Sequence, residues 1–402
     1  MARILAVGNL VLDVILNVTH FPAEDEELRA DARHQQPGGN AANTLHVLTQ
    51  LGHETSLVTT LAMDAQARQL SELLTARGID LSHAQRKLKG DTPTSYILIP
   101  EAGASRTIVH YRNLPEVDFE HFAKIEIESF DWLHFEGRNV EELKGMLNIA
   151  RTFCPDTPRS LELEKPRDGI EALLDQVHVL FTGRHYARAM GFEDGPACIK
   201  ALRQQAPQAQ IICTWGEDGA WYQAPGGTIE HVPAEKVRVR DTLGAGDTFL
   251  AGVLHRLLES APLEDAVRYG SQLAARKCRQ VGLDNLLEPL PDDQPLANVE
   301  DVSSAKATIA KVPGRDVSLI LIRDGDTVKA YVNNCPHQHV PLNEAYKVDV
   351  NPFQKTMKCS VHDAWFKIED GECVDGPCLG DHLQPYPIRI DEAGNIYAAP
   401  EE

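Results

Sequence analysis

The chain has 402 residues, which is too long for one ordinary core, so we expect two domains. Its composition, 43% hydrophobic and 24% charged, is typical of a globular protein, and its net charge of −20 disfavours nucleic acid and anionic membranes as partners. No apolar run approaches the roughly 18 residues that span a bilayer, and the first residues enter a strand pattern without a signal-peptide cleavage site. We therefore expect a cytoplasmic protein.

Residues 2–18 predict two short strands with a bend at Gly8 and Asn9, because apolar side chains recur on both sides of it. Asp13 lies inside the second apolar run. A buried, unpaired carboxylate is unfavourable, so we expect Asp13 to face a polar cleft. The alternative is an aspartate at a strand edge that points to water.

The glycine pair Gly38 and Gly39 predicts a sharp turn before a helix that runs to Gly52. Asn40 and Asn43 are three positions apart and share one face of the first turn of this helix. Asparagine offers both a donor and an acceptor, which suits a ligand with several hydroxyls. A capped helix with an Asx turn is the alternative.

The β-rich runs at 92–99 and 106–111 flank residues 101–104 and predict a hairpin. From residue 132 to residue 280 strand-like and helical runs alternate, which predicts a doubly wound α/β sheet with helices on both faces. The early β-rich segments do not fit this alternation, so we expect them to form a small β lid.

The stretch 241–249 reads Asp-Thr-Leu-Gly-Ala-Gly-Asp-Thr-Phe, and an apolar run that predicts a helix follows it. Free amides near Gly244 to Asp247 at a helix start would bind an anion. A carboxylate beside a phosphate site would be repelled unless it takes a proton from the attacking hydroxyl, so Asp247 is our candidate general base. An N-capping aspartate in a glycine turn is the alternative.

This motif resembles the signature of the ribokinase-like carbohydrate kinases. Other stretches resemble the ketohexokinase branch of that family, which phosphorylates the C1 hydroxyl of fructose: 37–43, 89–95, 105–109, 134–139, 162–167 and 274–278. The resemblance covers residues 3–288. It implies a kinase that uses ATP and Mg²⁺, and many family members respond to K⁺.

The resemblance also implies roles for individual residues. Asp247 would be the base, and Gly244, Ala245 and Gly246 would form the anion hole. The sugar hydroxyls would be bound by Asp13, Gly39, Asn40 and Asn43, with Arg138 in support. The nucleotide would contact Arg106, Trp215, Gly216 and Cys278, although plain core packing is the alternative for Trp215 and Cys278.

By analogy with ketohexokinase, the lid, including the acidic segment around Asp25, would pair with the lid of a second subunit in a homodimer. Many relatives have an Asn-x-x-Glu motif that organises the metal. The corresponding residues of this chain, 181–187, lack this motif. Ketohexokinase lacks it too, but has a lysine where this chain has Gly183 followed by Arg184. We expect Arg184 to be a surface residue; contact with phosphate is the alternative.

A proline-rich, acidic segment at 289–295 ends the first domain. We expect a kinase domain at 1–292, a linker at 293–304 and a second domain at 305–402. In the second domain, runs at 318–323 and 328–333 predict a hairpin around Asp324 and Gly325. Four of the eight cysteines lie here beside histidines, whereas the others are scattered and are expected to be reduced core thiols.

Two loops carry a metal-binding pattern, Cys335-Pro-His337 and Cys359-Ser-Val-His362. Zinc accepts two cysteines and two histidines, but zinc fingers usually have one pair of cysteines followed by one pair of histidines. The mixed order is that of Rieske 2Fe-2S centres. The surrounding residues resemble ferredoxin-type Rieske domains over 305–398, which implies an all-β domain with a 2Fe-2S cluster and a redox partner.

Departures from the Rieske pattern bear on the cluster. His339 stands where the family usually has glycine. Ala364 and Phe366 replace a serine and a tyrosine that donate hydrogen bonds in high-potential relatives, so we predict a potential on the low side of the Rieske range. Cys373 and Cys378 are either core thiols or a neighbouring pair.

Together these observations predict an ATP-dependent sugar kinase that converts fructose to fructose 1-phosphate, with an appended Rieske domain for electron transfer or redox sensing. One alternative is a Rieske electron carrier on a non-catalytic, sugar-binding scaffold. Another is a kinase for a different sugar or a nucleoside.

Overall fold

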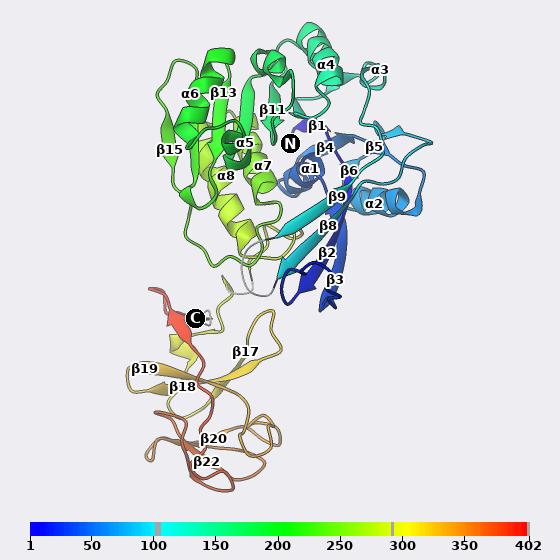
Figure 1. Ribbon diagram of the computed structural model, residues 1–402. Coiled ribbons are helices and arrows are strands. Elements are labelled where there is room, and N and C mark those ends of the chain that lie inside the picture. The colour runs from blue at the N-terminus through cyan, green and yellow to red at the C-terminus, as the bar shows by residue number, and fades with distance from the viewer. Residues whose placement is uncertain (101–105, 291–292, 400–402) are drawn as a thin grey trace. The chain divides into compact units, whose positions relative to one another are not determined.

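The computed structural model describes residues 1–100, 106–290 and 293–399, which form two compact units, 1–287 and 288–402 (Figure 1). The predicted hairpin turn at 101–104 and part of the proline-rich segment, Pro291 and Asp292, lie outside the described residues. Among the described residues, no helix is long and apolar enough to cross a bilayer.

The first unit is built on a nine-stranded sheet. Its strands are parallel except that β14 runs antiparallel to both of its neighbours. In spatial order they are β6 (Ile79–Asp80), β4 (Glu54–Val58), β1 (Arg3–Val7), β10 (Trp132–Glu136), β11 (Arg159–Leu163), β12 (Val179–Gly183), β13 (Gln210–Thr214), β14 (Ala220–Gln223) and β15 (Glu230–Val232).

Helices cover both faces of this sheet, because side chains alternate along each strand. In β1, Ile4 and Ala6 join one core cluster, and Leu5 and Val7 join the other. The first cluster includes residues of α1 (Asn40–Gln50), α2 (Ala65–Ala76), α7 (Ala245–Leu258) and α8 (Leu263–Cys278). The second includes residues of α3 (Phe119–Phe122), α4 (Val140–Phe153), α5 (Arg184–Ala189) and α6 (Gly195–Gln205). The predicted doubly wound α/β sheet is confirmed.

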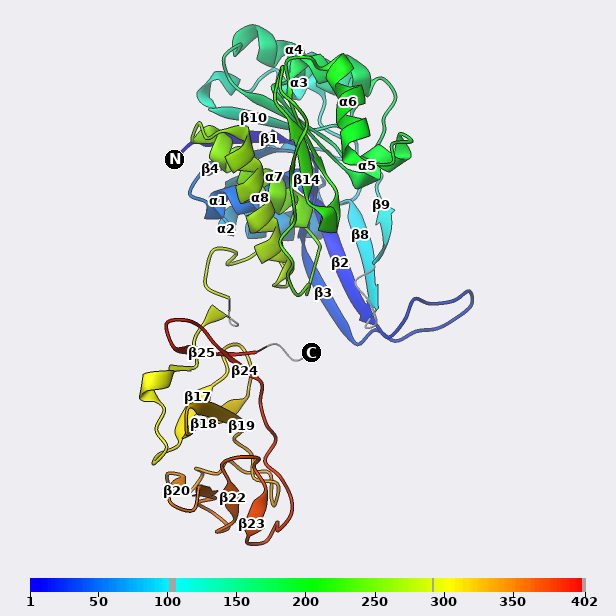
Figure 2. The same cartoon turned by 90° about the vertical axis from the view of Figure 1, so that its left-hand side faces the viewer.

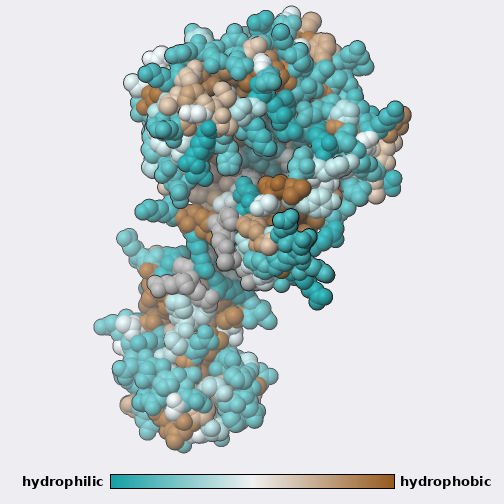
Figure 3. All heavy atoms as spheres, viewed as in Figure 1, coloured by the Kyte–Doolittle hydropathy of each residue, from teal (hydrophilic) through white to brown (hydrophobic). Residues whose placement is uncertain are grey.

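A separate four-stranded sheet forms the predicted lid (Figure 2). Its spatial order is β3 (Ala32–Gly38), β2 (Val11–Val18), β8 (Thr94–Pro100) and β9 (Thr107–Tyr111). Since β2 follows β1 after only three residues, the bend at 8–10 carries the chain directly from the main sheet into the lid. Large side chains of β8 and β9 remain exposed: Tyr96, Ile108, Val109 and Tyr111. Figure 3 shows hydrophobic residues in small groups on a surface that is mostly hydrophilic.

Among its described residues the second unit contains no α-helix, and all of its sheets are antiparallel. The predicted hairpin is present as β18 (Ser318–Asp324) and β19 (Thr327–Val332), joined by β17 (Thr308–Lys311). A second sheet contains β20 (Asp349–Asn351), β21 (Thr356–Lys358), β22 (Trp365–Lys367) and β23 (Cys373–Asp375). The segment expected as a linker includes β16 (Ala297–Asn298), which pairs with β25 (Asn395–Ala398), itself paired with β24 (Ile388–Ile390).

Candidate functional site

The glycine motif forms the start of α7. Gly244 caps this helix with φ of 79°, a conformation that favours glycine. A Cβ added to Gly246 would meet no atom within 4 Å, so the space beside the first turn at this residue is open. The first-turn amides of a helix lack partners within it, and this loop therefore offers donors to an anion.

Asp247 lies in that first turn and is buried, with 8% of its surface exposed. Its carboxylate accepts a 2.7 Å hydrogen bond from the side-chain amide of Asn43 on α1. The pKa of Asp247 is raised from 3.8 to about 7, chiefly by burial; the hydrogen bond from Asn43 opposes this rise, and the charges of Glu164 and Asp13 contribute to it. A carboxylate with this pKa can take up a proton near neutral pH.

The two glycines before α1 allow the chain to pack closely against Asp13. A Cβ on Gly38 would lie 2.1 Å from the Asp13 carboxylate, and one on Gly39 would lie 2.2 Å from the carbonyl oxygen of Asn9. Gly39 also has φ of 103°. Asp13 itself is buried, which raises its pKa to about 6 against the opposing effect of a hydrogen bond with Ser95.

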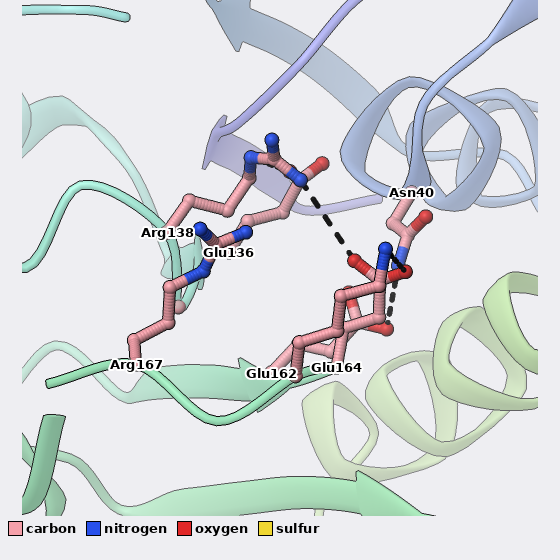
Figure 4. A pocket seen from close by; sticks show the side chains of 8 residues that line it. Asn40, Glu136, Arg138, Glu162, Glu164 and Arg167 are labelled. Carbon is pink, nitrogen blue, oxygen red and sulfur yellow. Dashed lines mark hydrogen bonds and ion pairs between the residues drawn. The ribbon is translucent and has the colours of Figure 1, made fainter. Parts of the chain in front are cut away.

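A polar pocket continues from this turn (Figure 4). The side-chain amide of Asn40 donates a 3.0 Å hydrogen bond to Glu162, and Arg138 donates a 2.9 Å bond to Glu116. Arg138 also pairs with Glu164 at 3.8 Å. The pocket is lined by Asn40, Glu136, Gly137, Arg138, Glu162, Glu164, Lys165 and Arg167.

Two carboxylates of this pocket received no role from the sequence: Glu136 is buried and Glu162 is half-buried, and they lie near the ends of adjacent parallel strands. Glu136 ends β10 and accepts the backbone amides of Ala41 at 2.6 Å and Asn9 at 3.2 Å. Glu162 on β11 has one side-chain oxygen, Oε2, that is buried and has no partner among the described residues. Burial raises the pKa of both carboxyls, to about 7 for Glu136. Polar residues at the carboxyl ends of parallel strands are the signal that could have identified them.

A buried lysine that sequence reasoning also missed holds the glycine motif in place. Lys277 on α8 is fully buried, and its ammonium donates to the Asp241 carboxylate at 2.6 Å. The same carboxylate accepts the backbone amides of Leu243 at 2.8 Å and Gly282 at 3.1 Å. The signal was a lysine next to Cys278 on the apolar side of a helix.

The lid contacts the same motif, because Arg106 donates a 2.7 Å hydrogen bond to the Thr242 hydroxyl. Trp215 is buried in the second core cluster and packs edge to face on Trp221, as the core-packing alternative predicts. Gly216 has φ of 66°, and a Cβ there would lie 3.5 Å from the guanidinium of Arg184. Arg184 is therefore half-buried beside the expected nucleotide pocket rather than isolated on the surface.

The remaining nucleotide candidate, Cys278, ends α8 and is half-buried. Its carbonyl oxygen accepts the backbone amides of Arg240 at 2.7 Å and Asp241 at 3.3 Å. Cys278 thus contacts the start of the glycine motif through its backbone. Its binding role, like those of the other candidate residues, stays a prediction.

In the second unit, two similar loops present the predicted metal ligands. The Cys335 amide bonds the Val340 carbonyl at 2.8 Å, and the Cys359 amide bonds the Ala364 carbonyl at 2.9 Å. Both sulfurs are buried, and the ligand atoms of Cys335, Cys359 and His362 lie within 4.8 Å of one another.

The histidines complete this group. His362 Nε2 bonds Gln338 at 2.9 Å, while its Nδ1 interacts with the Cys359 sulfur at 3.9 Å and therefore faces another of the predicted ligands. The His337 ring lies 4.4 Å from that of His362, so two sulfurs and two imidazoles are brought together. This donor set fits a Rieske 2Fe-2S cluster, in which cysteines bind one iron and histidines the other. His339 has φ of 55°, which explains why glycine is usual there.

Comparisons with known proteins find similarity in both units. A model of the pfkB family carbohydrate kinases matches residues 1–290, and a model of the Rieske [2Fe-2S] domain matches residues 292–387. Ketohexokinase from Mus musculus is 36% identical over 294 residues, which cover 71% of this chain and 99% of the relative. An ATP-dependent ribose-1-phosphate kinase from Halopiger xanaduensis is 26% identical over 68% of this chain and 91% of the relative.

Solved structures share the fold of the first unit. Ribokinase from Thermotoga maritima aligns with a TM-score of 0.58 and 22% identity, over 71% of this chain and 96% of that one. Ribokinase from Arabidopsis thaliana, complexed with ribose and ATP, aligns with a TM-score of 0.59 and 18% identity, over 71% and 98%. The predicted ribokinase-like fold is confirmed.

Proposed function

This chain belongs to the pfkB family of carbohydrate kinases and carries a C-terminal Rieske [2Fe-2S] domain, and from this premise we propose that it phosphorylates the C1 hydroxyl of fructose with ATP. The similarity to mouse ketohexokinase over nearly the whole length of that enzyme supports the substrate. Other similar proteins are kinases of ribose 1-phosphate and of nucleosides, so the test compares these classes of acceptor.

The buried Asp247 at the open start of α7 carries the proposal. In the proposed reaction, the sugar hydroxyl attacks the γ-phosphorus of ATP in line, its proton passes to Asp247, and ADP leaves with the electrons of the broken bond. Magnesium bound with ATP would neutralise the phosphates. The amides around Gly246 would stabilise the charge on the transferring phosphoryl group.

The residues that bind the sugar would surround this carboxylate. Asn43 already contacts Asp247, and Asp13 lies close enough for its charge to raise the pKa of Asp247. Asn40 and Arg138 line the adjoining pocket. Arg106 connects the lid to the anion loop, as closure over a nucleotide would require.

The test is a screen of ATP consumption with ketoses, aldoses and nucleosides, for the wild type and Asp247→Asn. We expect fructose to be the preferred acceptor and the variant to lose about 10²–10⁴-fold in kcat. Equal rates for the two proteins would exclude Asp247 as the base. Preference for a nucleoside would overturn the substrate and leave the kinase chemistry intact.

For the second domain we propose electron transfer through the cluster held by Cys335, His337, Cys359 and His362, because this donor set fits a 2Fe-2S centre. A chemically reduced cluster should be reoxidised by a redox partner protein, and stopped-flow absorbance would measure the rate. Redox sensing is the competing role. A change in kinase rate between oxidised and reduced protein would favour it.

We also propose a homodimer through the lid. The apolar side chains of β8 and β9 are exposed, between 48% and 61% for Tyr96, Ile108, Val109 and Tyr111, in the part of the family fold that pairs subunits in ketohexokinase. Light scattering should give twice the chain mass, and Val109→Asp should give a monomer. A monomeric wild type would exclude this interface.

A further inference from the structure

Two cysteines outside the predicted ligand set lie side by side in the second unit. The Cys378 thiol donates to the Cys373 sulfur at 3.3 Å, and both side chains are buried. A disulfide bond is about 2.05 Å long, so the sulfurs need to approach by only about 1.3 Å to form one. Both cysteines belong to one buried core cluster, and within it they form the predicted neighbouring pair.

The backbone holds the pair at the base of a short loop. The Cys373 amide bonds the Asp381 carbonyl at 2.7 Å, and the Gly380 amide bonds the Cys373 carbonyl at 2.9 Å. Residues 374–377 and 379–380 are exposed around the two thiols, and Leu379 has 71% of its surface exposed. A small reagent therefore reaches the sulfurs after a local opening of this loop.

The pair also adjoins the metal site. The side chains of Cys378 and Cys335 interact, and a Cβ on Gly376 would lie only 2.7 Å from the Ala364 Cα at the end of the second ligand loop. Cross-linking Cys378 would therefore change what packs against a ligand of the cluster.

We propose that Cys373 and Cys378 form a redox-active dithiol that closes to a disulfide with a small-molecule disulfide such as oxidised glutathione. One cysteine sulfur attacks the reagent and releases one reagent thiol, and the second cysteine then attacks this mixed disulfide and releases the other. One S–S bond is consumed and one is formed, and both cysteine protons end on the reagent thiols. This site is independent of the kinase chemistry.

The test uses the full chain with its cluster loaded, equilibrated without oxygen in glutathione buffers, acid-quenched, alkylated and digested with trypsin. Cleavage after Lys367 and Arg389 gives a peptide, 368–389, that contains both cysteines and no other. After oxidation, we expect this peptide to be lighter than its dithiol form by two hydrogens and to carry no alkyl label. After reduction, we expect it to carry two alkyl labels. Two labels, or glutathione adducts without closure, in the most oxidising buffer would overturn the proposal.

The chain supplies a matched control. Cys198 and Cys213 also interact and are both fully buried, but they lie within α6 and β13 and fall on different tryptic peptides. We expect both to be labelled under every condition, because local opening costs more free energy in regular elements packed in the core than in an exposed loop. In Cys373→Ser, the remaining Cys378 should carry a label or one glutathione. Loss of two hydrogens from that variant peptide would show that the mass change has another cause.

Discussion

The side-chain amide of Asn43 donates a 2.7 Å hydrogen bond to the carboxylate of Asp247, 204 residues further along the chain. This bond joins the first turn of α1 to the first turn of α7. It lowers the pKa of Asp247, whereas burial raises it more strongly, and the result is about 7. The pKa of the proposed base is thus lowered by Asn43, a residue that is also a candidate sugar ligand.

The first prediction concerns this bond. Activity requires the ionised form of Asp247, so kcat/KM should rise with pH through about 7 and level off above it. Removing the donor in Asn43→Ala should raise the pKa of Asp247 and move this rise to higher pH. The pH profile of kcat/KM measures the shift, and Asn139→Ala, an asparagine before α4, is the control. If the pH profile of kcat/KM is unchanged in Asn43→Ala, Asn43 does not set the pKa of Asp247 and this prediction is wrong.

The second prediction concerns Lys277. In Lys277→Met the Asp241 carboxylate loses its buried partner, so the first unit should lose about 3–5 kcal/mol in its free energy of unfolding. Because all described α-helices lie in that unit, urea unfolding followed by helical circular dichroism reports on it. The exposed Lys200→Met on α6 is the control. The double variant with Asp241→Asn should recover part of the loss, and a single variant as stable as the control would refute the structural role.

The third prediction concerns Glu136, whose pKa burial raises from 4.5 to about 7. Between these values the folded state holds a proton that the unfolded state has released, so stability should fall as pH rises from about 4.5 to about 7. Asp13, with a pKa raised to about 6, also makes the stability of the folded state fall as pH rises.

Glu136→Gln keeps an oxygen that accepts the amides of Asn9 and Ala41 but carries no charge. At pH 8 it should stabilise the first unit by on the order of 1–3 kcal/mol and flatten this part of the stability curve. Urea unfolding across pH measures both effects, with the exposed Glu141→Gln as the control. Equal slopes for the two variants would contradict the prediction.

The fourth prediction concerns the potential of the cluster. Ala364 and Phe366 are fully buried and lack the hydroxyls that stabilise the reduced cluster in high-potential relatives, so the potential should lie in the lower half of the roughly −150 to +300 mV Rieske range. Phe366→Tyr should raise it. A redox titration followed by electron paramagnetic resonance measures the change, and the exposed Phe353→Tyr should leave the potential unaltered. A wild-type potential near the upper limit would be inconsistent with this reasoning.

Local sequence determined much of this protein. The φ of 79° at Gly244 favours glycine, so the anion loop could be predicted from the motif itself. The alternation of strand and helix predicted the doubly wound sheet, and the spacing of Cys335 with His337 and of Cys359 with His362 predicted the metal loops. Each of these features depends on residues close together in the chain.

Only the tertiary structure decided which distant residues meet. Glu136 reaches Asn9 because β10 pairs with β1, and Lys277 reaches Asp241 because α8 returns beside the loop before α7. Cys373 and Cys378 form a pair because backbone bonds at 380–381 close their loop. Periodicity and turn residues report burial and local conformation, whereas these contacts depend on strand order and helix packing, which the whole core sets by burying its apolar surface.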